Sequence, residues 1–228
     1  MRNQEMEIKD LPLLALQRAA SPGPGEQPWL LLLMHGVGSN EKDLFGLAPY
    51  VPPRFHVLSL RAPYAMPMAG PDSHGWFAFS VDAQGRRHID EAQARQARAL
   101  LLTTLQEAQT RLGVGPARSV LGGFSQGGIM ALTTLLTQPA LARAAMVWHG
   151  RLLPEALHEQ AAQAQFTGKS LWVSHGVDDN VIPLSSAQAI RTHVQELPLE
   201  LSYHEYPGYH ELRPEELAAS MQWLQALE

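Results

Sequence analysis

Three polar residue types that can form a proton relay follow strand-like segments in the second half of the chain. Ser125 is the centre of Gly-Phe-Ser-Gln-Gly at 123–127, a match to G-x-S-x-G. A serine hydroxyl is a weak nucleophile at neutral pH, so it needs a base, and the base needs an acid that holds its tautomer. Asp178, Asp179 and His210 follow in the order serine, acid, histidine. The pattern predicts acyl transfer with Ser125 as nucleophile, His210 as base and one aspartate as acid.

The segments on either side of Ser125 favour a strand that turns sharply into a helix. The run 118–124 is apolar, and the run 127–136 has a helix-like composition. In such a turn the serine is pushed out of the sheet, and glycines prevent a collision between strand and helix. The bare pattern is expected by chance in roughly one chain in ten of this length, so the flanking elements carry the inference.

Each relay residue has a structural alternative. Ser125 could be an ordinary serine in a glycine-rich turn, and His210 could be a surface histidine. Asp179 could cap the turn that follows it, which would leave Asp178 as the acid. All of these residues nevertheless follow expected strands, and reacting groups in open α/β sheets gather beyond the carboxyl ends of the strands. We therefore favour the proton relay.

An oxyanion formed during acyl transfer needs two backbone N–H groups. One should belong to Gln126, the residue after the nucleophile. The other should come from the loop after an earlier strand, where His-Gly-Val-Gly occupies 35–38 and Val37 is the candidate. We interpret His35 and His175, each of which precedes a glycine at a strand end, as structural residues that bond loop backbone.

The alternation of apolar and helix-like runs predicts an α/β fold with a mostly parallel, doubly wound sheet flanked by helices. The expected strands are 13–18, 29–34, 55–60, 118–124, 144–148, 170–174 and 201–206. The expected helices are 39–50, 90–112, 127–137, 154–165, 185–197 and 214–227. Residues 1–28 should supply an N-terminal strand and loop, and 1–228 should form a single domain.

The connection 61–89 is long and too apolar for a solvated linker. Connections of this length in compact domains are often functional. We expect it to form a lid or a pocket wall. Met66, Trp76 and Phe77 within it are candidate substrate contacts.

Composition limits the classes of partner. The chain has 228 residues, no cysteine and a formal net charge of −5. Without cysteine there is no disulfide or thiolate metal site, and the histidines and carboxylates show no metal-binding spacing. The acidic balance argues against nucleic acid and anionic membranes. No stretch has the length of a signal-peptide core or a membrane span, which predicts a soluble, cytoplasmic protein that acts on a small molecule.

Six segments resemble the phospholipase/carboxylesterase family, the bacterial relatives of acyl-protein thioesterases. They are MHGVG at 34–38, RAPYAMPM at 61–68, GWFAF at 75–79, LGGFSQGGIMAL at 121–132, HGVDDNVIP at 175–183 and YPGYHELRPEEL at 206–217. The resemblance implies an α/β-hydrolase fold and hydrolysis of short- or medium-chain acyl esters or thioesters. It also implies that no cofactor is needed, and it makes a homodimer plausible.

The resemblance assigns roles to the relay residues. Ser125 matches the nucleophile and His210 matches the base. In the family's segment the acid lies four residues after the histidine and four before the proline. That spacing from His175 and Pro183 selects Asp179 as the acid.

The chain also departs from the family near the expected pocket. Ala78 stands where an acidic residue is common, and Tyr209 stands where glycine is frequent. Trp148 and His149 stand where a small residue and glycine are more usual. Both are candidate substrate contacts, although His149 could equally cap a loop. These departures bear on substrate specificity and leave the reaction class intact.

Two other functions fit the same fold. A related hydrolase could act on a lactone or a peptide, although the absence of cysteine excludes a thiol nucleophile. A peptidase would more often add a gating domain. A non-catalytic ligand-binding protein would be expected to lose a member of the relay, and none is missing. A fluorophosphonate probe would label an enzyme and leave a binding module untouched.

Overall fold

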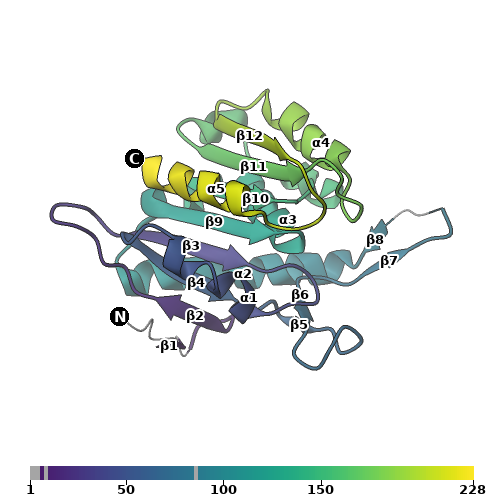
Figure 1. Ribbon diagram of the computed structural model, residues 1–228, viewed down its shortest axis with the longest axis horizontal. Helices are drawn as coiled ribbons and strands as arrows, with labels where there is room; N and C mark the ends of the chain where they lie inside the picture. Colours follow the sequence, from purple (N-terminus) through teal and green to yellow (C-terminus); the bar gives the residue numbers. More distant parts are fainter. Residues whose placement is uncertain (1–5, 8–9, 85–86) are drawn as a thin grey trace.

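The centre of the structure is a mostly parallel β-sheet (Figure 1). The computed structural model describes residues 6–7, 10–84 and 87–228. Within these residues the sheet has eight strands, in the spatial order β1 (Met6–Glu7), β2 (Ala15–Arg18), β4 (Phe55–Leu60), β3 (Trp29–Met34), β9 (Ser119–Phe124), β10 (Ala144–Trp148), β11 (Ser170–Gly176) and β12 (Glu200–Tyr206). The pairs β1–β2 and β2–β4 are antiparallel, and the other neighbours are parallel. The predicted fold class is confirmed.

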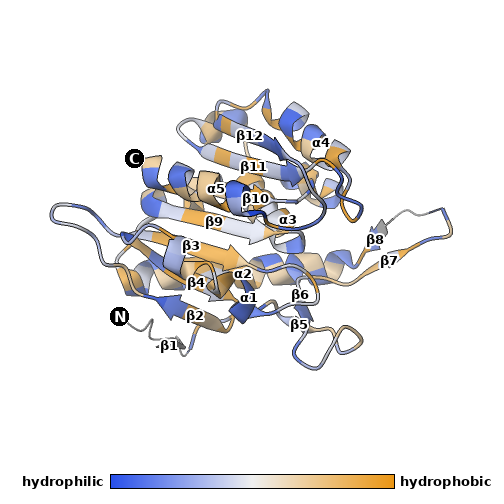
Figure 2. Ribbon diagram, viewed as in Figure 1, coloured by the Kyte–Doolittle hydropathy of each residue, from blue (hydrophilic) through white to orange (hydrophobic). Residues whose placement is uncertain are grey.

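The middle strands of the sheet are buried along their whole length. Every residue of β3, β10 and β11 is buried. Helices cover both faces of a parallel sheet, so its strands need no polar face. The edge strand β12 is partly exposed instead. Figure 2 shows this contrast, with β3 in orange and β12 largely in blue.

Helices pack on both faces of the sheet and create two apolar layers. Those that cover one face are α2 (Glu91–Leu112), α3 (Gln126–Thr137) and α4 (Leu184–Val194). Those that cover the other face are α1 (Glu41–Phe45) and α5 (Pro214–Ala226). Alternate side chains of β3 divide between the layers, because Leu30 and Leu32 join the first and Leu31 and Leu33 the second. In Figure 1, α5 lies in front of the sheet and α2 lies behind it.

The longest helix, α2, has the ends that its sequence predicts. The Asp90 carboxylate accepts a hydrogen bond of 3.0 Å from the Gln93 N–H at the N-terminus. Gly113 ends the helix with a φ of 65°, which glycine adopts without strain. No helix in the described parts of the chain is both long and apolar enough to cross a bilayer. Three short 3₁₀ helices each precede a strand of the sheet: η1 (Ala48–Tyr50) precedes β4, η2 (Pro116–Arg118) precedes β9 and η3 (Pro139–Leu141) precedes β10.

The connection 61–89 contains two short hairpins. The first is formed by β5 (Tyr64–Ala65) and β6 (His74–Gly75), and the second by β7 (Phe79–Val81) and β8 (Arg87–Ile89). Trp76 and Phe77, between the hairpins, are buried in the core. The second hairpin projects beyond the body of the protein (Figure 1). The apolar composition of this connection thus reflects packing at its centre.

The prediction of a helix at 154–165 is wrong. Two 3₁₀ helices, η4 (Pro154–Glu159) and η5 (Gln163–Phe166), take its place. Between them, the Ala161 N–H donates to the Leu136 carbonyl of α3 at 2.9 Å. A continuous helix would have used this N–H internally, so packing against α3 overrides the helical propensity of the segment.

Candidate active site

Ser125 lies at a sharp turn between β9 and α3. Its φ of 53° and ψ of −117° fall where residues other than glycine are rarely found. The Ser125 N–H donates to the Trp148 carbonyl at 2.9 Å, and the Ser125 carbonyl accepts from the Ile129 N–H at 3.0 Å. These bonds tie the turn to β10 and α3, and they hold a backbone conformation that would otherwise relax.

Two glycines make this turn possible. A Cβ added at Gly127 would lie 1.9 Å from the Met34 carbonyl oxygen, and one added at Gly123 would lie 2.3 Å from the backbone of Gly127. Neither site has room for a side chain, because β3, β9 and α3 converge there. The structural reason for the pentapeptide is therefore the one that the sequence predicts.

Side chains from three loops meet beyond the carboxyl end of the sheet. His210 Nε2 is 2.9 Å from Ser125 Oγ, and His210 Nδ1 is 2.6 Å from Asp179 Oδ2. Ser125, Asp179 and His210 follow β9, β11 and β12, and these parallel strands end at the same edge of the sheet. The structure thus brings together the three residues that the sequence singled out, whereas Asp178 is exposed.

The two carboxylate oxygens of Asp179 have different partners. Oδ1 accepts the N–H groups of Val181 at 2.9 Å and Ile182 at 2.8 Å, while Oδ2 faces His210. Asp179 therefore caps its own loop and also belongs to the relay. Burial acts to raise the pKa of Asp179, but hydrogen bonds from His210, His149 and the two N–H groups outweigh it and lower that pKa to about 2.

The charge on Asp179 fixes the tautomer of His210. An ionised carboxylate only accepts hydrogen bonds, so Nδ1 of His210 carries a proton. In the neutral ring, Nε2 is then the acceptor for the Ser125 hydroxyl at 2.9 Å. This arrangement can remove the hydroxyl proton and stabilise the resulting imidazolium, which is the chemistry of a serine nucleophile.

Two backbone N–H groups lie beside Ser125. Val37 and Gln126 both line the cleft next to it. Gln126 is the first residue of α3, where an N–H has no acceptor within the helix. Within the described residues, neither this N–H nor that of Val37 donates to another protein group. A donor at the N-terminus of α3 and a second donor in the loop after β3 can together stabilise negative charge on a substrate oxygen.

The cleft beside Ser125 is small and mostly apolar, with a cavity volume of about 50 Å³. The residues that line it are Val37, Phe77, Phe79, Ile89, Ser125, Gln126, Ile129, Arg151, Val181 and Ile182. Phe79 and Ile89 belong to the second hairpin of the connection 61–89, so this connection forms one wall of the cleft. Val181 and Ile182 belong to the loop that Asp179 caps.

Comparison with known proteins identifies the family of the chain. The family described as Phospholipase/Carboxylesterase matches residues 18–228, which is most of the chain. The chain belongs to the phospholipase/carboxylesterase family. It is 31% identical to esterase YpfH of Escherichia coli (strain K12) over 167 residues, which are 73% of this chain and 67% of YpfH.

Solved structures place this member of the phospholipase/carboxylesterase family among the α/β-hydrolases. The crystal structure of esterase PE8 matches with a TM-score of 0.81 and 26% identity, over 95% of this chain and 99% of that one. The Bacillus cereus carboxylesterase matches with a TM-score of 0.79 and 20% identity, over 95% of each chain, which supports the fold. The α/β-hydrolase fold is confirmed, and the protein is a serine hydrolase of an esterase family.

Of the five substrate contacts expected in this esterase, Phe77 alone lines the cleft among the described residues. Trp76 is fully buried in the core, and Met66 packs over a glycine of β6. Trp148 is fully buried in the layer beneath α1 and α5, because it lies on the same face of β10 as Met146. The expectation that Trp76 and Trp148 touch substrate is therefore corrected, whereas Met66, which is partly exposed, remains a predicted contact.

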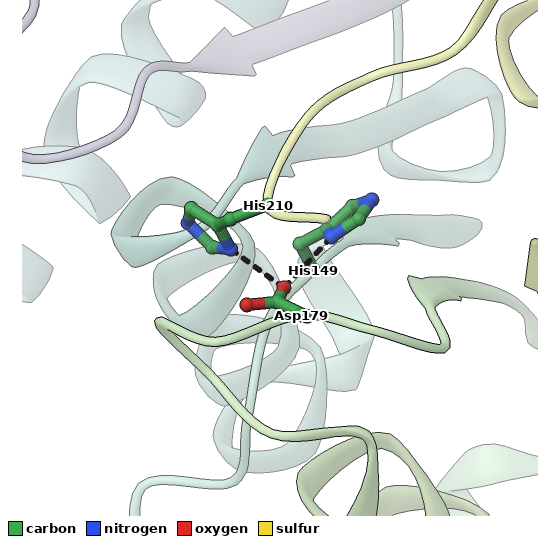
Figure 3. A group of neighbouring side chains, drawn as sticks. All are labelled: His149, Asp179 and His210. Carbon is green, nitrogen blue, oxygen red and sulfur yellow. Dashed lines mark hydrogen bonds and ion pairs between the residues drawn. The ribbon is translucent and has the colours of Figure 1, made fainter. Parts of the chain in front are cut away.

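His149 is the fifth expected contact, and it lies behind Asp179. Its side chain is 1% exposed, and its Nδ1 is 2.9 Å from Asp179 Oδ2. Figure 3 shows the carboxylate between the rings of His149 and His210. One side-chain nitrogen or carboxylate oxygen from each of these three residues lies within 4.8 Å of the others. The spacing of these residues along the sequence did not predict this cluster. Hydrogen bonds within the cluster account for this closeness.

His35 and His175 hold loop backbone, which fits their structural interpretation. Nε2 of His35 accepts the Ala62 N–H at 3.0 Å, and Nε2 of His175 donates to the Ile182 carbonyl at 2.7 Å. Burial lowers the pKa of both rings, so both are neutral at pH 7. Sequence reasoning did not single out Arg151 or Val181 as cleft residues, although both lie just beyond strands that carry site residues.

Proposed function

We propose that this serine hydrolase cleaves short-chain carboxylic esters through an acyl-enzyme formed on Ser125. The observation that carries the proposal is the continuous chain of contacts from Ser125 Oγ through His210 to Asp179, at 2.9 and 2.6 Å. The chain ends on a carboxylate whose low pKa keeps it ionised wherever a histidine can act as a base.

In the first step, Ser125 Oγ attacks the ester carbonyl carbon while His210 Nε2 takes the hydroxyl proton. The carbonyl oxygen becomes an oxyanion, which the N–H groups of Val37 and Gln126 would hold. Collapse of the tetrahedral intermediate breaks the bond to the alcohol, which leaves with the proton from His210. Water, activated by His210, then attacks the acyl-enzyme, and the carboxylic acid departs with Ser125 restored.

The size of the cleft supports short acyl groups. The cleft has a cavity volume of about 50 Å³, well below the roughly 300–1,000 Å³ of pockets that enclose drug-sized ligands, so it encloses a short acyl chain more readily than a long one. The apolar wall formed by Phe77, Ile129 and Ile182 suits the methylene groups of a short chain.

The test is turnover of p-nitrophenyl esters of increasing acyl length by wild type and by Ser125→Ala. We expect kcat/KM to be highest for acetate to butyrate and to fall for longer chains. Ser125→Ala should lose on the order of 10³–10⁶ in turnover. Ser185→Ala, an exposed serine on α4, is the matched control and should keep wild-type turnover.

Different outcomes separate the proposal from its rivals. Wild-type turnover by Ser125→Ala would end the acyl-enzyme mechanism. A wild-type protein that hydrolyses no ester and resists fluorophosphonate would instead be a ligand-binding member of the fold. Parallel assays with acetyl and butyryl thioesters measure the preference between ester and thioester.

A further inference from the structure

His149 is a buried histidine that the proposed mechanism does not use. It follows the last residue of β10 with a φ of 52°, a conformation that favours glycine. Its N–H donates to the Ser174 carbonyl of β11 at 2.9 Å. A non-glycine residue keeps such a backbone only where its surroundings hold it firmly. The side-chain contacts of His149 are therefore the features that need explanation.

Both ring nitrogens of His149 face a carboxylate. Nδ1 is 2.9 Å from Asp179 Oδ2, and Nε2 is 3.4 Å from both carboxylate oxygens of Glu216. Glu216 lies in the first turn of α5, is fully buried and accepts the Arg213 N–H at 3.3 Å. A buried acid on α5 thus contacts the relay through one imidazole.

A neutral imidazole cannot satisfy both carboxylates. It has one N–H donor and one lone pair, so one of its nitrogens would direct a lone pair at a carboxylate oxygen. A second proton removes this conflict and places one positive charge between two acids. Burial lowers the pKa of His149, but the hydrogen bonds and charges of Glu216 and Asp179 outweigh it and raise that pKa.

The other groups around His149 do not supply a competing positive charge. His175 is stacked on it with ring centroids 5.0 Å apart, and burial lowers the pKa of His175. Burial, together with the charge of Glu216, raises the pKa of Tyr206 on β12, so its phenol is neutral. The Arg213 guanidinium at the start of α5 pairs with Glu211 and Glu215. Among the described residues, the other titratable side chain that faces His149 is His210, whose ring centroid is 5.5 Å away.

We propose that His149 is a positioning residue that shares Asp179 Oδ2 with His210 and, as an imidazolium paired with Glu216, keeps His210 unprotonated in more acidic solution. The inference rests on the proposed function, because it concerns the base of that reaction. A second imidazolium at His210 would have to share one oxygen with the first and would lie 5.5 Å from it. Protonation of His210 is thereby disfavoured.

His149→Asn tests this through the pH profile of kcat/KM for p-nitrophenyl acetate. Asparagine tolerates a positive φ and keeps an N–H donor near Asp179, but it carries no charge and does not reach Glu216. We expect the acidic limb to move to higher pH by about one unit, while the plateau falls less than about tenfold. A limb that stays in place, in a variant that folds and turns over, overturns the proposal.

Two further variants test whether His149 and Glu216 act through the same charge. Glu216→Gln removes the balancing acid, so His149 should lose its second proton and the limb should move in the same direction. The double variant should shift no further than His149→Asn alone, because both changes act through one charge. Additive shifts would contradict the shared route. His158→Asn, a matched change of an exposed histidine, should leave the limb in place.

A measurement on the wild-type protein keeps the test independent of the variants' folding. Long-range ¹H–¹⁵N NMR of protein labelled at histidine reports which ring nitrogens carry protons. The resonances assigned to His149 should show two protonated nitrogens at neutral pH. One bare nitrogen would overturn the proposal, whatever the activity. This readout does not depend on turnover, so it separates failure of this inference from failure of the proposed function, which Ser125→Ala tests.

Discussion

The Gln126 side chain is hydrogen-bonded to the backbone N–H of Trp76, with its Oε1 2.7 Å from that nitrogen. Its Nε2 donates to the Phe77 carbonyl, also at 2.7 Å. All of these groups are buried. Gln126 therefore anchors the connection 61–89, and with it the Phe77 wall of the cleft, to the start of α3.

Gln126→Ala should reduce the stability of the protein. It leaves a buried N–H and a buried carbonyl without partners, at a cost of about 1–3 kcal/mol for each group. We expect the free energy of unfolding, measured by chemical denaturation, to fall by at least about 2 kcal/mol. Gln106→Ala, at an exposed position of α2, is the control and should cost little. Equal unfolding free energies for the two variants would show that the anchor contributes nothing.

Gly127→Ala should be among the most destabilising single changes in the chain. The added Cβ would lie 1.9 Å from the Met34 carbonyl oxygen, and backbone cannot move aside cheaply. We expect a loss of more than about 3 kcal/mol in unfolding free energy, or failure to fold. Gly115→Ala is the matched control, because its φ is −77° and nothing lies within 4 Å of the new Cβ. A Gly127→Ala protein as stable as that control would contradict the packing at the turn.

Asp179→Asn and Asp178→Asn should show which of the two adjacent aspartates acts as the acid. Asp179 Oδ2 holds the His210 tautomer, so its loss should lower kcat by about 10³–10⁴. Asp178 is exposed and its charge is screened, so kcat/KM should stay within a factor of about three. Steady-state kinetics with p-nitrophenyl acetate measures both. A larger loss for Asp178→Asn would move the acid to the neighbouring position.

The depressed pKa of Asp179 predicts how stability depends on pH. The pKa of about 2 in the folded protein lies below the ordinary aspartate pKa of 3.8, which also applies to the unfolded chain. The stabilisation is therefore fully present above the unfolded pKa and is lost as pH falls through the folded pKa. Between about pH 5 and pH 2 this amounts to about 2 kcal/mol of unfolding free energy. The difference in unfolding free energy between wild type and Asp179→Asn should shrink by that amount. A difference that is constant with pH would contradict the assignment.

Local sequence patterns predicted the central strands and the relay. The bounds of Trp29–Met34, Phe55–Leu60 and Ala144–Trp148 agree with the observed strands, because these mostly apolar runs are flanked by polar or proline residues. The turn at Ser125 could also be predicted from the sequence, because glycines are required where three backbones converge. Such signals lie within a few residues of one another, and tertiary packing does not override them.

Contacts between distant residues could not be predicted in this way. The bond from Trp76 to Gln126 joins residues 50 apart, and the contact between His149 and Glu216 joins residues 67 apart. No pattern along the chain predicts which side chains of distant residues will be in contact. Trp148 illustrates the limit, since its position beyond an active-site strand suggested a pocket role, whereas the pleat of β10 turns it into the opposite layer. The predicted substrate contact of Trp148 failed for this reason.

Fluorophosphonate labelling followed by peptide mapping tests the central claim most directly. The probe reacts with a serine hydroxyl only where a base and an oxyanion site act on it together, and its adduct is stable. The account predicts one modified residue, Ser125, with labelling abolished in Ser125→Ala and strongly slowed in His210→Ala. Modification of a different residue, or undiminished labelling of Ser125→Ala, would contradict it.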